Sequence, residues 1–103
     1  MKVRVADTAK YEPCYNSTTH IVEGTILRLK PLLMKTFDVA EDLEVVIRPI
    51  RQKRGMTTGG LSTGQLLIEV DCRIVDVFHI ADIIAHEMTH TEQKHQGRLG
   101  WKY

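Results

Sequence analysis

The segment from Val77 to about Gln96 carries a long helix pattern, which restricts the fold more than any other feature of the sequence. Asp76 before it is the predicted N-cap, and Gly97 after it is the predicted C-cap. The apolar residues recur at three- and four-residue steps and therefore share one face of the helix. Such a face must be buried, so we expect the helix to lie on a sheet. The predicted face contains Val77, Ile80, Ile84 and Met88.

An earlier helix is predicted over residues 18–37, where apolar residues again recur at helical spacing. Gly24 lowers the helix propensity of this segment, and Pro31 is expected to kink or restart the helix. Asn16 or Ser17 can cap its start. The sequence thus places one helix before the strand-forming region and one after it.

Two segments between the helices, residues 43–50 and 65–71, are rich in β-branched and other apolar residues and are predicted strands. Residues 2–6 alternate polar and apolar side chains, which fits a short further strand. Because the two central strands are consecutive, we expect them to pair antiparallel. The predicted fold class is α+β, with an N-terminal helix, a small, mostly antiparallel sheet and a second helix near the C-terminus, in one domain spanning residues 1–103.

The composition is that of an ordinary globular protein. The 103 residues are 43% hydrophobic and 26% charged, and the net charge is +1. This balance gives no reason to expect nucleic acid or an anionic membrane as a partner. No run approaches the roughly 20 apolar residues of a membrane span, and the first residues lack the apolar core of a signal peptide. Cys14 and Cys72 are expected to be reduced thiols, which fits a cytoplasmic location.

The sequence H-E-M-T-H, residues 86–90, lies well inside the C-terminal helix. Residues four apart lie about 40° apart around a helix, so His86 and His90 can reach one ion from the same face. Glu87 points to the side, where it can take a proton from a water that the ion activates. We therefore predict zinc as the cofactor, His86 and His90 as metal ligands, and Glu87 as the catalytic base.

The surroundings of this motif favour a metal site over two histidines on a solvated helix face. The residues immediately around it carry no charge, as a buried active-site helix requires. The predicted apolar face lies on the opposite side of the helix and would fix it to the sheet. These features outweigh the chance occurrence of a five-residue pattern.

The motif, preceded by a strand pair and a supporting helix, resembles the zincin metallopeptidases. The longer run H-E-M-T-H-T-E-Q is similar to small metallopeptidase-like proteins encoded by bacteriophages, and more loosely to SprT-like proteases. The close match covers about residues 83–99, and Glu92 departs from it, because the extended pattern has an apolar residue there. The resemblance implies a protein or peptide substrate, in the host-cell cytoplasm or the virion. It also implies that residues 64–71 form an edge strand that binds extended substrate by strand addition.

The third metal ligand is harder to place, because only residues 91–103 follow His90. His95 is the natural candidate. If the helix ends near Thr91, His95 can fold back onto the ion. If the helix continues to Gly97, His95 lies about 180° around from His86 and cannot bind. We predict His95 as the third ligand, and a contact between its imidazole and the helix C-terminus is the alternative.

Further polar residues are candidates for supporting roles. Asp82, one turn before His86, is placed to orient the imidazole ring. His79 is roughly 10 Å from His86 by helix rise, which is too far to share the ion. Gln93 can position His90, line a cleft or remain solvated. Other donors left open are His20, Glu41, Asp42 and a residue of a second subunit.

Residues 51–64 form a basic, glycine-rich segment that lacks the spacing of a phosphate-binding loop. We interpret it as a solvated loop between strands, with a mobile rim over a substrate cleft as the alternative. Trp101 and Tyr103 are interpreted as aromatic anchors of the C-terminal tail. Tyr103, Tyr11 and Tyr15 are also candidates for binding an oxyanion, and no spacing favours one of them.

Two other functions compete with that of a zinc metallopeptidase. A metal-dependent endoribonuclease would use a three-histidine spacing that His86, His90 and His95 miss by one residue, and such enzymes have glycine where this chain has Glu87. A virion or regulatory protein would hold zinc for structure alone, in a closed four-ligand site rather than an open three-ligand one. The sequence leaves the oligomeric state and the natural substrate open.

Overall fold

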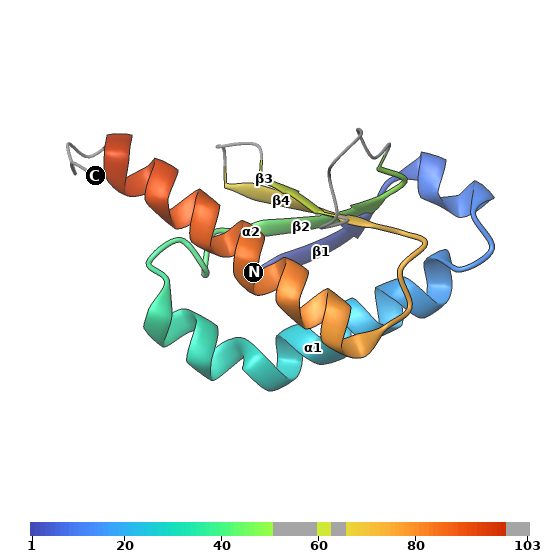
Figure 1. Ribbon diagram of the computed structural model, residues 1–103, viewed down its shortest axis with the longest axis horizontal. Coiled ribbons are helices and arrows are strands. Elements are labelled where there is room, and N and C mark those ends of the chain that lie inside the picture. Colours follow the sequence, from blue (N-terminus) through green and yellow to red (C-terminus); the bar gives the residue numbers. More distant parts are fainter. Residues whose placement is uncertain (51–59, 63–65, 99–103) are drawn as a thin grey trace.

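The computed structural model describes residues 1–50, 60–62 and 66–98. A sheet forms one layer, and the two long helices cover one of its faces (Figure 1), so the fold is α+β. The elements, in chain order, are β1 (Lys2–Val5), the 3-10 helix η1 (Asp7–Tyr11), α1 (Tyr15–Thr36), β2 (Glu44–Arg48), β3 (Gly60–Ser62), β4 (Leu67–Asp71) and α2 (Val77–Arg98).

The described strands lie in the order β1-β2-β4-β3, and their pairing corrects the prediction. β1 pairs parallel with β2, and β2 pairs parallel with β4. β3, which falls in the segment predicted as a loop, pairs antiparallel with β4. The expected antiparallel pairing of β2 and β4 was wrong because β3 precedes β4 in the chain and pairs antiparallel with it on its outer side. β4 therefore runs parallel to β2.

This order also changes which strand lies at the edge. β4 lies between β2 and β3, so residues 64–71 do not provide the edge strand that the resemblance implied. β3 takes that position in the described sheet, directly against α2. A peptide that adds to the sheet as a strand beside α2 would therefore pair with β3.

The two faces of the sheet differ because side chains alternate along each strand. The face under the helices is apolar, and the opposite face carries ion pairs together with the buried Val46. The fully buried strand residues under the helices are Val45, Ile47, Ile68 and Val70. The ion pairs on the opposite face are Arg4–Glu44 (2.9 Å) and Arg48–Glu69 (2.8 Å).

Both helices follow the predicted segments with corrections at their ends. Pro31 lies inside α1, so the helix does not restart there, which was one of the two outcomes expected of this residue. Asp76 caps α2 as predicted, because its Oδ1 accepts a hydrogen bond of 2.9 Å from the backbone N–H of His79. The prediction that Gly97 ends the second helix was wrong, since α2 continues to Arg98.

The face of α2 that packs on the sheet agrees with the predicted one at three of its four positions. Ile80, Ile84 and Met88 have no exposed surface, whereas Val77 is 47% exposed. Ile83, Glu87 and Thr91 are also buried on this helix. Val77 lies instead beside residues of α1, where it stays partly exposed.

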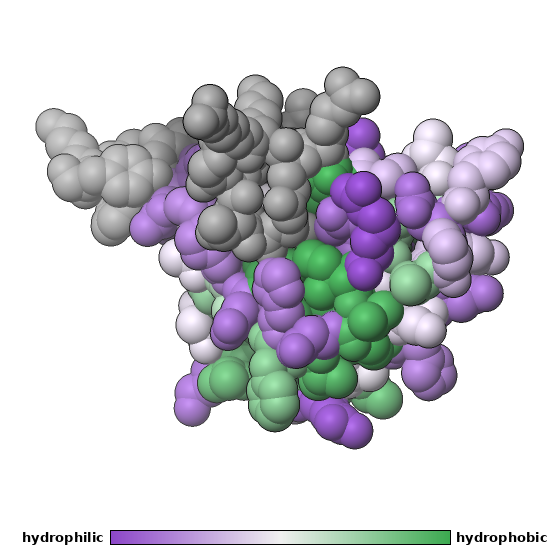
Figure 2. Space-filling view, turned by 45° about the vertical axis from the view of Figure 1, so that its right-hand side comes forward, coloured by the Kyte–Doolittle hydropathy of each residue, from purple (hydrophilic) through white to green (hydrophobic). Residues whose placement is uncertain are grey.

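Several large apolar side chains reach the surface near that first turn. Figure 2 looks onto the side of the molecule where the start of α2 approaches α1, and it shows apolar side chains surrounded by hydrophilic ones. Phe78 is 82% exposed and Val75 is 49% exposed. No helix of the described residues is long and apolar enough to cross a membrane.

The cysteines are both free, and their environments differ. Cys14 is exposed and Cys72 is buried. Burial raises the pKa of the Cys72 thiol, because the charged thiolate loses its hydration there. We therefore expect thiol reagents to modify Cys14 much faster than Cys72.

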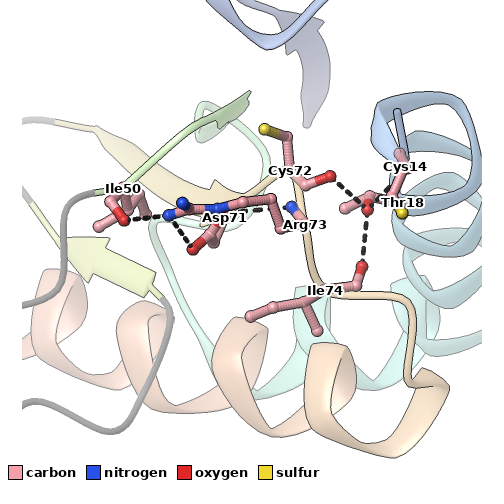
Figure 3. Close-up of polar contacts among 7 residues, drawn as sticks. All are labelled: Cys14, Thr18, Ile50, Asp71, Cys72, Arg73 and Ile74. Carbon is pink, nitrogen blue, oxygen red and sulfur yellow. Dashed lines mark hydrogen bonds and ion pairs between the residues drawn. The ribbon is translucent and has the colours of Figure 1, made fainter. Parts of the chain in front are cut away.

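A polar network fixes the connection between β4 and α2 (Figure 3). The Thr18 hydroxyl of α1 lies 2.8 Å from the carbonyl oxygen of Cys72 and 2.6 Å from that of Ile74. The Arg73 guanidinium donates to both carboxylate oxygens of Asp71, at 2.9 Å each, and to the carbonyl oxygen of Ile50. The hydrogen bonds to Asp71 raise the pKa of Arg73 above its ordinary value. These contacts set where α2 begins.

Replacing Thr18 with valine tests this network. The substitution preserves shape but leaves a buried carbonyl oxygen without its hydroxyl donor, so we expect a loss of about 1–3 kcal/mol in the free energy of unfolding. Thr19→Val is the control, because the Thr19 hydroxyl bonds only the Tyr15 carbonyl of its own helix in the described residues. Urea unfolding followed by circular dichroism measures both. Equal stability losses in the two variants would contradict the assigned role of Thr18.

Candidate metal centre

His86 and His90 lie one turn apart on the exposed side of α2, beside the sheet-packed face. Their Nε2 atoms are 3.0 Å apart, and the two rings are nearly perpendicular, at 86°. Two nitrogen ligands at about 2.0–2.1 Å from a tetrahedral zinc ion lie about 3.3 Å from each other. A small rotation of either side chain therefore brings the pair to the spacing of two zinc ligands. Without an ion, the same approach allows a hydrogen bond between one protonated and one unprotonated nitrogen.

Glu87 occupies a different environment from its neighbours. It is only 5% exposed, and its Oε1 lies 3.8 Å from Nε2 of His86. Its Oε2 is buried and has no hydrogen-bond partner among the described residues. A buried carboxylate oxygen without a donor is costly. The three side chains form the one group of possible metal-binding residues in the described part of the chain, with ligand atoms within 4.8 Å of one another.

The wall that buries Glu87 depends on Gly60 of β3. A Cβ built at this position would lie 2.4 Å from Cγ2 of Ile83, 3.1 Å from the Glu69 carbonyl oxygen and 3.2 Å from Cγ of Glu87. The first of these distances is impossible without movement, and Cγ2 of isoleucine is close to the backbone. Glycine therefore allows the edge strand to lie directly against the stem of Glu87 and hold it beside the histidines.

The burial of the Glu87 carboxyl group should lower the stability of the metal-free protein. We expect Glu87→Met to raise the free energy of unfolding of the metal-free protein by about 1–2 kcal/mol, because it replaces a buried carboxyl group, whose Oε2 has no partner among the described residues, with an apolar side chain of similar length. Urea unfolding in the presence of a chelator measures this change. Glu92→Met is the matched control, because Glu92 accepts hydrogen bonds from the Asp38 backbone N–H at 3.0 and 3.1 Å, so its loss should destabilise. Destabilisation by both substitutions would indicate that Glu87 is a structural residue.

The structure does not bring His95 to the histidine pair. α2 continues without a break to Arg98, which is the arrangement in which His95 lies about half a turn around from His86. His95 is half-buried and does not belong to the group formed by His86, Glu87 and His90. The prediction of His95 as third ligand therefore does not fit this helix. The reason is that helix propensity continues past Thr91, where the prediction needed a turn.

The supporting residues named from the sequence are placed as follows. Asp82 is exposed and makes no hydrogen bond to His86 in the described structure, so the expected orienting contact is missing. His79 lies in the first turn of α2, two turns before His86. Gln93 is exposed on the turn after His90. The remaining candidates His20, Glu41 and Asp42 are exposed on α1 or before β2, and none joins the group.

Glu92 has a structural explanation for its departure from the apolar pattern. Its carboxylate binds the Asp38 backbone N–H, and Gln96 one turn later donates to the Asp38 carboxylate at 3.3 Å. Both contacts attach the end of α2 to the turn after α1. Residues 51–59, Trp101 and Tyr103 lie outside the described residues, so the predicted basic rim and aromatic anchors are not placed. Tyr11 is 89% exposed on η1, and Tyr15 packs against the core.

Two residues of the site were not found from the sequence. Gly60 appeared only as one of several glycines in an apparent loop, and Thr91 as an uncharged neighbour of the motif. Thr91 is fully buried, and its hydroxyl donates to the Glu87 carbonyl oxygen at 3.0 Å. A short strand with one glycine facing a helix shows no alternating pattern in the sequence. The roles of Gly60 and Thr91 therefore become apparent only once the sheet is known.

Comparison with known proteins finds no matching family model, no matching curated protein and no matching solved structure. The function therefore has to be inferred from the chemistry of the site itself.

Proposed function

We propose that this protein is a zinc-dependent metallopeptidase, with His86 and His90 as metal ligands and Glu87 as general base. The observation that carries the proposal is the pairing of two converging imidazole nitrogens with a buried carboxylate whose Oε2 has no hydrogen-bond donor among the described residues. A structural carboxylate would have its hydrogen bonds satisfied. A carboxylate held for proton transfer needs an oxygen that is free to accept one.

The residues of the site have different roles in peptide hydrolysis. A zinc ion bound to the histidines would supply Lewis-acid chemistry. Glu87 then takes a proton from the attacking water and passes it to the amine that leaves. Its burial under β3 holds the carboxylate in one place and keeps bulk water away.

The substrate is proposed to bind along β3. This strand is the edge of the described sheet, and α2 lies against it. An extended peptide that pairs with a sheet edge gains main-chain hydrogen bonds, independent of its side chains. The contact between Gly60 and Glu87 links this edge to the base, so a peptide bound there passes close to the histidine pair. The substrate class is therefore unstructured protein or extended peptide.

Neither competing function gains support from a specific observation. The endoribonuclease alternative needs His95 beside His86 and His90, and the continuous α2 separates them. The purely structural zinc site needs four protein ligands, and the described residues bring together two histidines and one carboxylate. Zinc binding without hydrolysis would favour this alternative.

The proposal is tested by metal removal. The purified chain should cleave an unstructured substrate such as casein, lose this activity in a chelator and regain it when zinc is added. Gel electrophoresis and mass spectrometry of the fragments follow the reaction. Magnesium added in place of zinc is the control, because imidazole ligands suit zinc far better than magnesium. Cleavage that persists in the chelator would exclude the mechanism.

A further inference from the structure

A groove lies between α1 and the first turn of α2, with a volume of about 220 Å³. Small-molecule sites commonly measure about 300–1,000 Å³. The groove is therefore suited to one anchoring side chain of a protein partner. We call it the α1 groove, and its lining residues are His20, Ile21, Gly24, Thr25, Arg28 and Val77.

Gly24 keeps this groove open without serving any packing need inside the protein. A Cβ built on Gly24 would meet no heavy atom within 4 Å. A glycine in the middle of a helix lowers the helix-forming equilibrium constant by about fivefold relative to alanine. At Gly60 a close neighbour explains the glycine, but at Gly24 the described structure offers no such neighbour. The space above Gly24 is thus available to something outside the chain.

The hydrogen-bond donors at the groove favour an acidic partner. His20 and Arg28 flank Gly24 on α1 and lie about 12 Å apart along the helix. Neither side chain forms a hydrogen bond or ion pair with another described residue, and no carboxylate lines the groove. The Arg28 guanidinium and an imidazole N–H of His20, beside the apolar Ile21 and Val77, can donate to a segment that carries carboxylates next to an apolar side chain.

The rim of the groove is apolar on the α2 side. Val77 lines it, and Phe78 beside Val77 is 82% exposed. Figure 2 shows apolar side chains reaching the surface in this region of the molecule. Exposed aromatic side chains next to a small pocket are common among residues that dominate the energy of protein interfaces.

We propose that the α1 groove binds a protein partner through a segment that presents an apolar side chain next to acidic ones. The apolar side chain lies over Gly24 and contacts Ile21 and Val77, while the carboxylates pair with His20 and Arg28. This inference goes beyond the proposed peptidase. Val77 is about 13 Å from His86 along α2 and about half a turn around it, so the groove and the metal centre can be occupied independently.

Selection from a random peptide library displayed on phage, with the metal-free full chain as target, tests this proposal. We expect the enriched peptides to combine leucine or aromatic residues with aspartate or glutamate. Their affinities, measured by fluorescence anisotropy, should fall by about tenfold or more in Gly24→Phe, which fills the groove, and in Arg28→Glu. Lys35→Glu makes the same charge change elsewhere on α1 and should leave affinity unchanged.

Other results would overturn the proposal. These are a selection without acidic peptides, or peptides that bind Gly24→Phe as tightly as the unaltered chain. Peptides that copy this chain's own sequence, together with concentration-dependent dimerisation, would assign the groove to a second copy instead. Circular dichroism checks that Gly24→Phe folds. Phe78→Ala, at an exposed position, gives a second variant that should weaken binding without affecting the fold.

Discussion

Glu87→Gln should lower the rate of peptide hydrolysis by about 10²–10⁴-fold, which is the usual contribution of a general base. Glutamine preserves the size of the side chain but cannot take a proton from water. Because the buried stem packs against Gly60 in the same way, the fold and the approach of His86 to His90 should be unchanged. Initial rates of cleavage of a fluorogenic peptide, with zinc in excess, measure the effect.

The same variant separates two roles for Glu87. If Glu87 acts as the base, zinc affinity in Glu87→Gln should stay close to that of the unaltered chain, and kcat should fall while KM changes little. A parallel loss of zinc affinity and activity would make Glu87 a metal ligand instead. Activity equal to that of the unaltered chain would remove Glu87 from the mechanism. Glu92→Gln on the same helix is the control, since Glu92 binds the Asp38 backbone rather than the site.

His86→Ala and His90→Ala should each abolish near-stoichiometric zinc binding. Zinc sites with four ligands gain about 10–16 kcal/mol on binding, so one ligand contributes about 3 kcal/mol, which is on the order of a hundredfold in affinity. Competition with a chromogenic chelator measures the dissociation constant. Both histidines are exposed, so their replacement should leave the unfolding temperature of the metal-free protein nearly unchanged.

His95→Ala is the matched control for these variants. Since His95 lies about half a turn around α2 from His86, its replacement should leave zinc affinity intact. A loss of affinity equal to that in His90→Ala would show that the end of α2 unwinds when zinc binds. His95 would then be the third ligand that the sequence suggested.

The sequence predicted the segments of the fold well and their pairing poorly. Periodicity located both helices and the strands β2 and β4, because each buries one face or lies wholly in the core. Pairing direction depends on β3, which has three residues and begins with a glycine. A strand of three residues is too short to show an alternation of polar and apolar side chains. It can be recognised only from its pairing with β4. The antiparallel pairing expected from consecutive strands failed for that reason.

The candidate site could also be predicted only in part. Helical spacing alone places His86 and His90 on one side of α2, so the pair was predictable. The burial of Glu87 was not, because it results from the contact of Gly60 with α2 across the edge of the sheet. His95 depended on where the helix ends, and residues 91–96 have polar but helix-compatible side chains that continue it. Helix ends are set by tertiary contacts such as that of Gln96 with Asp38, which the sequence does not display.

The number of zinc ions bound per chain tests the central claim most directly. The chain is freed of metal, supplied with zinc, dialysed and analysed by native mass spectrometry, beside the double variant His86→Ala/His90→Ala. We predict one zinc ion per unaltered chain and none in the double variant. An unaltered chain that binds no zinc, or a double variant that binds it equally well, would contradict the assignment of the metal centre to the histidine pair of α2.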